Sequence, residues 1–215
     1  MNLLTEAITW IADNPGQFNR ALGQHLLMSI SAIVIALAIG LPLAIIIIRS
    51  RLMATLAVNS VNALRTLPSL AILAIMMPIL GIGLWPSIVA LTILALPPIL
   101  INAYIGLRDV DPDAVEAATG MGMSERQILR KIRIPLAAPA MFAGLRTASV
   151  QVLAGATLAP FTGGGGLGDF IAVGIAGMNQ SRLLVGAVPI AILALGTEFL
   201  LGQTERVLFG ERRAA

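Results

Sequence analysis

The sequence contains no cysteine and only one histidine, His25. The missing cysteines exclude disulfides, iron–sulfur clusters and thiolate zinc sites. A single imidazole is too few for a histidine-rich metal site, and no Ser-His-Asp arrangement is credible around it. Aromatic residues make up 4% of the chain, which argues against a stacking platform for single-stranded nucleic acid. We therefore expect no metal site and no catalytic residue in this chain.

Charge is also scarce, at 12% of 215 residues, while hydrophobic residues reach 57% and the mean hydropathy is +0.91. A soluble domain of this length needs a larger charged surface. A helix satisfies its own backbone polar groups where no water is present. The composition therefore predicts an all-α protein embedded in a lipid bilayer.

Five apolar stretches are long enough to cross a bilayer core of about 30 Å, which takes roughly 20 helical residues. They cover residues 26–48, 67–84, 87–106, 134–161 and 183–209. Before them, residues 2–13 repeat apolar positions at helical spacing, which predicts a short helix lying in the membrane interface. We interpret the whole chain, 1–215, as a single transmembrane domain.

Basic residues predict the orientation, because short loops rich in lysine and arginine remain in the cytoplasm. They gather after the first stretch, between the third and fourth, and at the end of the chain, at Arg49, Arg51, Arg108, Arg126, Arg130, Lys131, Arg133, Arg212 and Arg213. Five spans then place the N-terminus outside and the C-terminus in the cytoplasm. This distribution explains the pI near 10.5 without any binding of nucleic acid.

The longest polar stretch, residues 108–135, has the pattern of two short helices joined by a turn. Asp111 is typical of a helix start and Gly122 of a turn, and Ser124 with Gln127 three residues later has capping-box spacing. Alanine and methionine side chains in this stretch suit docking against another protein. The alternative is a loop packed on the inner face of the membrane.

This stretch resembles the EAA loop of membrane permease subunits in binding-protein-dependent ABC importers. The matching positions are Glu116, Ala117, Ala118, Gly122, Ile132, Ile134 and Pro135, with isoleucine at 134 where the family has leucine. The resemblance implies a type I importer permease (MetI-like) fold in a bacterial inner membrane. It also implies four kinds of neighbour: the lipid bilayer, a second permease, two cytoplasmic ATPases and an extracytoplasmic binding protein.

In such a loop the matching residues have distinct expected roles. Glu116 orients the first short helix by pairing or capping, and Ala117 and Ala118 allow close contact with an ATPase. Gly122 supplies the turn. Three apolar residues anchor the second helix to the membrane core: Ile132, Ile134 and Pro135. The sequence has no Gly-x-x-x-x-Gly-Lys-Ser/Thr loop, so we expect ATP and magnesium to be bound by the partner ATPase.

Two further segments extend the resemblance. Residues 65–70 are similar to an Arg-x-x-Pro-Ser stretch in the second core helix of these permeases, and residues 163–171 resemble the glycine-rich outer segment of the osmoprotectant branch. That branch imports glycine betaine, carnitine and choline. Methionine permeases have a similar segment, so methionine or another amino acid is the alternative cargo.

The glycine-rich segment contributes candidate residues for an outer gate, namely Gly163, Gly165, Gly168 and Asp169. The same glycines match the spacing of a dinucleotide-binding fingerprint. That motif follows a strand and opens a helix, whereas this segment follows an apolar span. We therefore expect a flexible loop or gate in which glycine permits close approach of helices.

Polar residues within or beside the apolar stretches are candidates for the transport pathway, because such groups face protein or water rather than lipid. They are Arg65, Arg146, Gln151 and Glu198. Arg146 and Glu198 either pair across the fourth and fifth spans or meet backbone and water separately. His25, just before the first span, is expected to be an interfacial residue.

Two other classes of protein fit the sequence less well. A channel or secondary transporter needs ring charges, a selectivity filter or internal repeats, and we find none of these patterns. A membrane enzyme needs more titratable groups within its spans. With two Trp and one Tyr, the chain is also poorly equipped to form an aromatic cage for a quaternary ammonium, which we expect in the binding protein.

Overall fold

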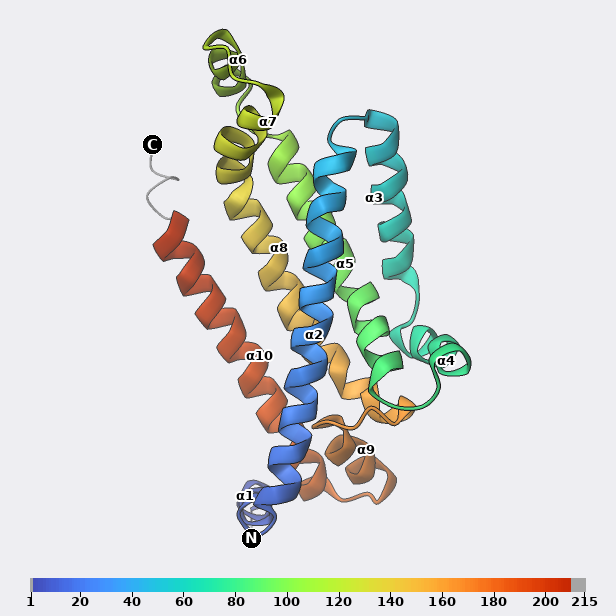
Figure 1. The fold of residues 1–215 in the computed structure, drawn as a ribbon. Helices are drawn as coiled ribbons and strands as arrows, with labels where there is room; N and C mark the ends of the chain where they lie inside the picture. Colours follow the sequence, from blue (N-terminus) through green and yellow to red (C-terminus); the bar gives the residue numbers. More distant parts are fainter. Residues whose placement is uncertain (1, 210–215) are drawn as a thin grey trace.

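The structure is a computed structural model that describes residues 2–209. Throughout that part, every regular element is a helix (Figure 1). Arg212 and Arg213, which contribute to the predicted orientation, lie outside the described residues, as does the C-terminal end of the predicted 1–215 domain.

Within residues 2–209, four helical stretches are long and apolar enough to cross a membrane. Three are the helices α2 (Pro15–Ile47), α5 (Leu84–Arg108) and α10 (Gln180–Phe209). The fourth runs from Glu125 to Thr162 and contains α8 (Ile134–Gly155). These helices confirm the first, third, fourth and fifth predicted spans.

The prediction that residues 67–84 form one straight membrane-spanning helix is wrong. The chain instead forms α3 (Arg51–Thr66) and α4 (Ser69–Leu80), which meet at an angle of 97°. Leu67 between them is extended, with ψ 129°, because the ring of Pro68 disfavours the helical conformation of the residue before it. If the bent pair is counted as one broken span, the structure has five spans, as predicted.

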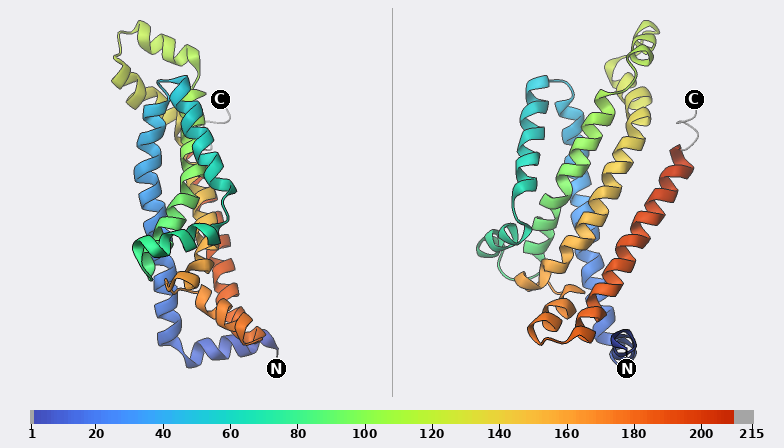
Figure 2. Two further views of the ribbon diagram at one scale, coloured as in Figure 1. Left: turned by 90° about the vertical axis from the view of Figure 1, so that its right-hand side faces the viewer. Right: turned by 180° about the vertical axis from the view of Figure 1, so that it is seen from behind.

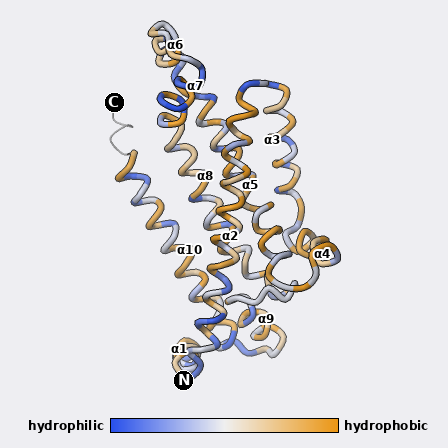
Figure 3. The backbone as a smooth tube through the Cα atoms, in the orientation of Figure 1, coloured by the Kyte–Doolittle hydropathy of each residue, from blue (hydrophilic) through white to orange (hydrophobic). Residues whose placement is uncertain are grey.

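Three of the long helices, α2, α5 and α8, form the centre of the bundle. Their contact is lined by small and medium side chains, among them Met28, Ala32, Ala36, Ala95, Ala148 and Val152. A side chain at Gly144 of α8 would lie 2.7 Å from the carbonyl oxygen of Pro98 in α5, so glycine is needed for this close approach. Figure 3 shows hydrophobic residues along these helices and hydrophilic ones at the α2–α3 turn and near α7.

Three short helices lie at the end of the bundle away from the loop of residues 108–135. They are α1 (Leu3–Asp13), a 3-10 helix (Ala156–Thr162) and α9 (Gly168–Ala176). The predicted helix over residues 2–13 is confirmed as a helix by α1. An aromatic contact joins α1 to α9, with the rings of Trp10 and Phe170 5.2 Å apart. Figure 1 shows α1 and α9 at the end away from the loop of residues 108–135.

Candidate functional site

The loop of residues 108–135 projects from one end of the molecule, next to the α2–α3 turn (Figure 2). It contains α6 (Pro112–Gly120), α7 (Glu125–Ile128) and a π-helical turn (Leu129–Arg133) that continues directly into α8. The predicted pair of short helices is therefore confirmed, and the second of them is continuous with a membrane helix.

The helix ends in this loop follow the sequence pattern. The Asp111 carboxylate accepts a hydrogen bond of 2.9 Å from the backbone N–H of Asp113, and the Ser124 N–H donates one of 2.8 Å to the Gln127 side chain. Gly122 has a φ of +77°, a left-handed conformation that other residues adopt only at a cost. The turn between α6 and α7 therefore depends on glycine at this position.

One face of α6 points away from the protein. Glu116 and Ala117 are exposed and Met121 is 74% exposed, whereas Ala118 is completely buried. Among residues 2–209, no hydrogen-bond or ion-pair partner of the Glu116 carboxylate is observed, so the expected orienting contact is not made there. This carboxylate and its exposed neighbours are therefore available to another molecule.

The other face of the loop is attached to the membrane helices. Ile132 and Ile134 pack against a buried cluster that includes Leu107 of α5 and Ala137 of α8. The guanidinium of Arg133 donates a hydrogen bond of 3.0 Å to the carbonyl oxygen of Leu107. Pro135 is the second residue of α8. The isoleucines, as expected, join the second short helix to the core.

A cavity of about 240 Å³ lies beside the break between α3 and α4. Arg65 and Gln151, which are far apart in the sequence, both line it, together with Ser69 and apolar side chains of α4 and α5. The Arg65 side chain has no partner observed within the described part of the chain. The break in the predicted second span thus brings two of the predicted polar residues to one place.

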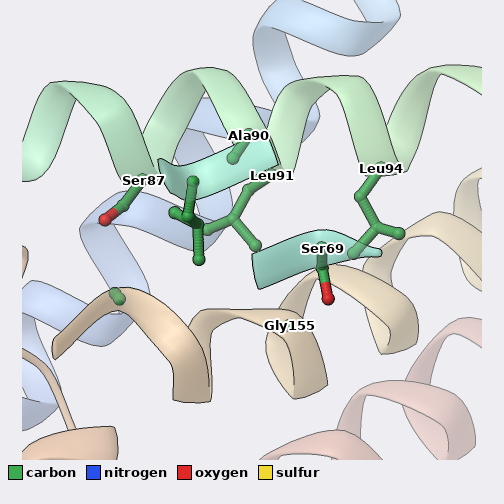
Figure 4. A pocket seen from close by; sticks show the side chains of 8 residues that line it. Ser69, Ser87, Ala90, Leu91, Leu94 and Gly155 are labelled. Atoms are coloured by element: carbon green, nitrogen blue, oxygen red, sulfur yellow. The ribbon is translucent and has the colours of Figure 1, made fainter. Parts of the chain in front are cut away.

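A smaller cavity of about 10 Å³ lies between α4, α5 and the C-terminal end of α8 (Figure 4). It shares Ser69 and Leu94 with the cavity of Arg65, and Ser87 also lines it. Its lining is mostly apolar, and Ser69 and Ser87 contribute its only side-chain hydroxyl groups. Ser69 belongs to the Arg-x-x-Pro-Ser stretch recognised in the sequence. Sequence reasoning missed Ser87, because a single hydroxyl group in a membrane helix has no distinctive spacing.

The glycine-rich segment is packed rather than free, which corrects the expected flexible loop. Gly163 and Gly165 have φ of +73° and +70°. A side chain at Gly168 would lie 2.3 Å from the Thr157 carbonyl oxygen, and the N–H of Gly166 donates a hydrogen bond of 3.2 Å to Gln24 of α2. The close approach expected of these glycines is confirmed.

Asp169 belongs to the same segment and lies in the first turn of α9. Its carboxyl is partly buried, and burial raises its pKa above the usual value because the charged form is poorly solvated there. Asp169 does not line either cavity described above. A role in a gate is therefore still only a prediction for this residue.

Arg146 of α8 is paired with Glu198 of α10, with 2.8 Å between its Nε and a carboxylate oxygen. Of the two alternatives that the sequence left open, the structure has the pair. Arg146 also donates to Glu205 at 3.3 Å, a contact that sequence reasoning missed. The available signal was the spacing, because a residue seven positions after Glu198 lies on the same helix face. These residues do not line the cavity of Arg65 and Gln151.

The predicted interfacial position of His25 is wrong. The side chain is completely buried within α2, and its Nε2 lies 3.1 Å from the carbonyl oxygen of Leu153 in α8. The helix begins at Pro15, well before the apolar stretch, so His25 lies inside the packed bundle. Among the described residues, no group of three or more His, Cys, Asp or Glu side chains is arranged to hold a metal ion.

The bundle with its broken span and projecting two-helix loop is that of a multi-pass permease. The family model of the binding-protein-dependent transport system inner membrane component matches residues 36–206, and the chain belongs to this family. Such a permease works with a separate ATP-hydrolysing subunit and a binding protein.

Named relatives cover nearly the whole chain. The carnitine transport permease protein OpuCB of Listeria monocytogenes is 42% identical, over 92% of this chain and 91% of its own length. The glycine betaine/carnitine/choline permease OpuCB of Bacillus subtilis is 39% identical over 94% of each chain. Among solved structures, an inward-facing form of the MetNI methionine ABC transporter matches with a TM-score of 0.80 and 25% identity, over 89% of this chain and 96% of that one.

Proposed function

We propose that this permease imports a small quaternary-ammonium osmoprotectant, such as glycine betaine, carnitine or choline. The observation that carries this proposal is the identity of 42% and 39%, over more than nine-tenths of the chain, to permeases named for these solutes. The solved methionine transporter supports a related fold, but its identity of 25% is lower. Methionine is therefore the second candidate cargo.

In the proposed assembly, two permeases, identical or related, associate with two ATPases and receive the solute from a binding protein. The N-terminus lies outside and the loop of residues 108–135 lies in the cytoplasm, where its exposed Glu116 and Ala117 contact an ATPase. The burial of Ala118 and the packing of Ile132 support this role, because they connect the exposed face to the membrane helices. Nucleotide-driven movement of the ATPase would then reach α8.

The cavity of Arg65 and Gln151 is the proposed place where this chain contacts the solute. Its guanidinium suits the carboxylate of carnitine or glycine betaine, and its apolar walls suit their methyl groups. A passage must bind weakly enough to release its cargo. One chain alone encloses the solute only in part, which fits weak binding. Selective recognition of the solute is then the task of the binding protein.

Uptake into vesicles tests the cargo. The permease is reconstituted with its ATPase and cognate binding protein, and labelled glycine betaine, carnitine, choline and methionine are offered in turn. We expect ATP-dependent uptake of at least one quaternary-ammonium solute and none of methionine. Uptake of methionine alone would reject the proposed cargo, and uptake in vesicles that lack the ATPase would reject the proposed mechanism.

The variant Arg65→Gln extends the same experiment to the pathway. It should slow uptake of the two carboxylate-bearing solutes more than uptake of choline, which has no carboxylate. Arg51→Gln, at the other end of α3 and away from the cavity, is the matched control. If Arg65→Gln slows uptake of all three solutes equally, Arg65 does not bind the carboxylate of glycine betaine or carnitine.

A further inference from the structure

We infer that the cavity between the loop of residues 108–135 and the ends of α2 and α5 binds the headgroup of an anionic phospholipid. The cavity measures about 730 Å³ and is lined by three arginines, Arg49, Arg108 and Arg133. The inference rests on the proposed orientation, which places this end of the bundle at the cytoplasmic leaflet. It does not depend on which solute is carried.

The three arginines come from separate elements and converge on the cavity. Arg108 donates a hydrogen bond of 2.9 Å to Asp109, and Arg133 uses one nitrogen for the Leu107 carbonyl, which leaves donors on both. Within residues 2–209, no hydrogen bond or ion pair of the Arg49 side chain is observed. Glu125 is the one carboxylate in the lining, so positive charge prevails.

The rest of the lining indicates a lipid rather than a small free anion. Ile45 and Ile48 at the end of α2 and Val115 on α6 give the cavity apolar walls beside its guanidinium groups. A phosphate ion would use only the arginines and would leave most of the volume empty. A phospholipid uses both surfaces, and basic pockets between membrane helices on the cytoplasmic side suit such headgroups.

The position of the cavity also separates it from the proposed ATPase contact. Val115 and Thr119 line the cavity, whereas the exposed Glu116 and Ala117 are not part of its lining. A bound headgroup would therefore lie behind the loop and connect α6 and α7 to the ends of two membrane helices. The lipid would affect how firmly the loop is held without occupying the surface offered to the partner.

Lipid retention by the purified transporter tests the inference. The complete complex with its ATPase is prepared in mixed micelles containing equal phosphatidylglycerol and phosphatidylcholine, and bound lipid is counted by native mass spectrometry. We expect selective retention of phosphatidylglycerol and about a fivefold weaker affinity in Arg49→Gln, since one arginine near anionic lipid contributes about that much. Arg108→Gln should act similarly. Arg51 lies two residues after Arg49 and is not part of the cavity lining, so Arg51→Gln should leave retention of phosphatidylglycerol unchanged.

Three results would overturn the inference. The first is equal retention of phosphatidylglycerol by the wild-type and Arg49→Gln complexes. The second is displacement of the lipid by millimolar inorganic phosphate, which would indicate a site for free anions. The third is loss of the ATPase subunit from the Arg49→Gln complex with retention of the lipid, which would assign the arginine to the protein interface. All readouts are taken without cargo, so they are independent of the uptake experiment.

Discussion

At the scale of single residues, Gly120, which ends α6, and Gly122, in the turn that follows, provide a matched pair. A side chain at either position would meet nothing within 4 Å, but only Gly122 has a positive φ. Gly122→Val should therefore lose most uptake while the protein still inserts into the membrane, because a left-handed backbone costs a residue with a side chain roughly 1–2 kcal/mol and distorts the turn.

Gly120→Val adds the same bulk to a helical backbone and should keep most of its uptake. Uptake by reconstituted vesicles measures both variants, and the yield of purified protein reports insertion. If uptake falls equally in the two variants, the added bulk rather than the backbone conformation is responsible for the loss. If Gly122→Val transports at the normal rate, the loop has no role in coupling.

The sequence predicted the loop of residues 108–135 well, because its helix caps and its turn glycine all indicate the same pair of short helices. The cap at Asp111 and the turn glycine at Gly122 are short-range features, and they appear in the structure where the pattern put them. His25 and Glu205 were misjudged or missed for the opposite reason. Their partners, Leu153 and Arg146, lie on other helices, and contacts of that range are not encoded in local spacing.

At the scale of elements, the ion cluster that joins α8 to α10 determines how a charge exchange should be designed. Arg146 contacts both Glu198 and Glu205, so Arg146→Gln removes the positive charge that both carboxylates contact. It should lower the midpoint of thermal unfolding in detergent more than Glu198→Gln does, because Glu198→Gln leaves the arginine one partner.

A simple exchange, Arg146→Glu with Glu198→Arg, should rescue poorly because the new carboxylate at position 146 faces Glu205. Adding Glu205→Gln should restore much of the lost stability. Thermal unfolding of the double and triple variants measures this difference. Rescue by the double exchange alone would show that Glu205 contributes little to the cluster.

The broken span shows where reasoning from hydropathy fails. The search for a continuous apolar stretch found residues 67–84, but α3 contains Asn59, Ser60, Asn62 and Arg65 and was passed over. Of these residues, Arg65 lines the cavity beside the bend between α3 and α4. The bend itself follows from Pro68, which the sequence displays, but its angle depends on packing against α5.

At the scale of the whole molecule, the orientation can be measured because the chain has no native cysteine. Met121 and Met178 are 74% and 93% exposed. Met121 directly follows α6 and Met178 lies between α9 and α10, and Figure 1 shows α6 and α9 at opposite ends of the bundle. In intact cells, a membrane-impermeant maleimide should label Met178→Cys, and it should reach Met121→Cys only after the membrane is permeabilised.

The permease is expressed without its ATPase in this experiment, so that the partner does not shield position 121. Labelling of both variants after permeabilisation shows that each site reacts when it is reached. The reverse pattern in intact cells would place the loop of residues 108–135 outside and would contradict both the proposed ATPase contact and the lipid site.

The helical stretch from Glu125 to Thr162 has 38 residues and runs from α7 through α8 to the 3-10 helix. Its α8 part alone, with 22 residues, is about 33 Å long at 1.5 Å per residue. Between its ends this stretch lies close to α5, at Gly144. We expect a sideways displacement of the α7 end to move the 3-10 end in the opposite direction about the contact at Gly144. Thr162, hydrogen-bonded to Ser87 at 2.7 Å, stands at the far end beside the glycine-rich segment. We therefore expect a displacement of the loop of residues 108–135 to reach the glycine-rich segment through this helical stretch.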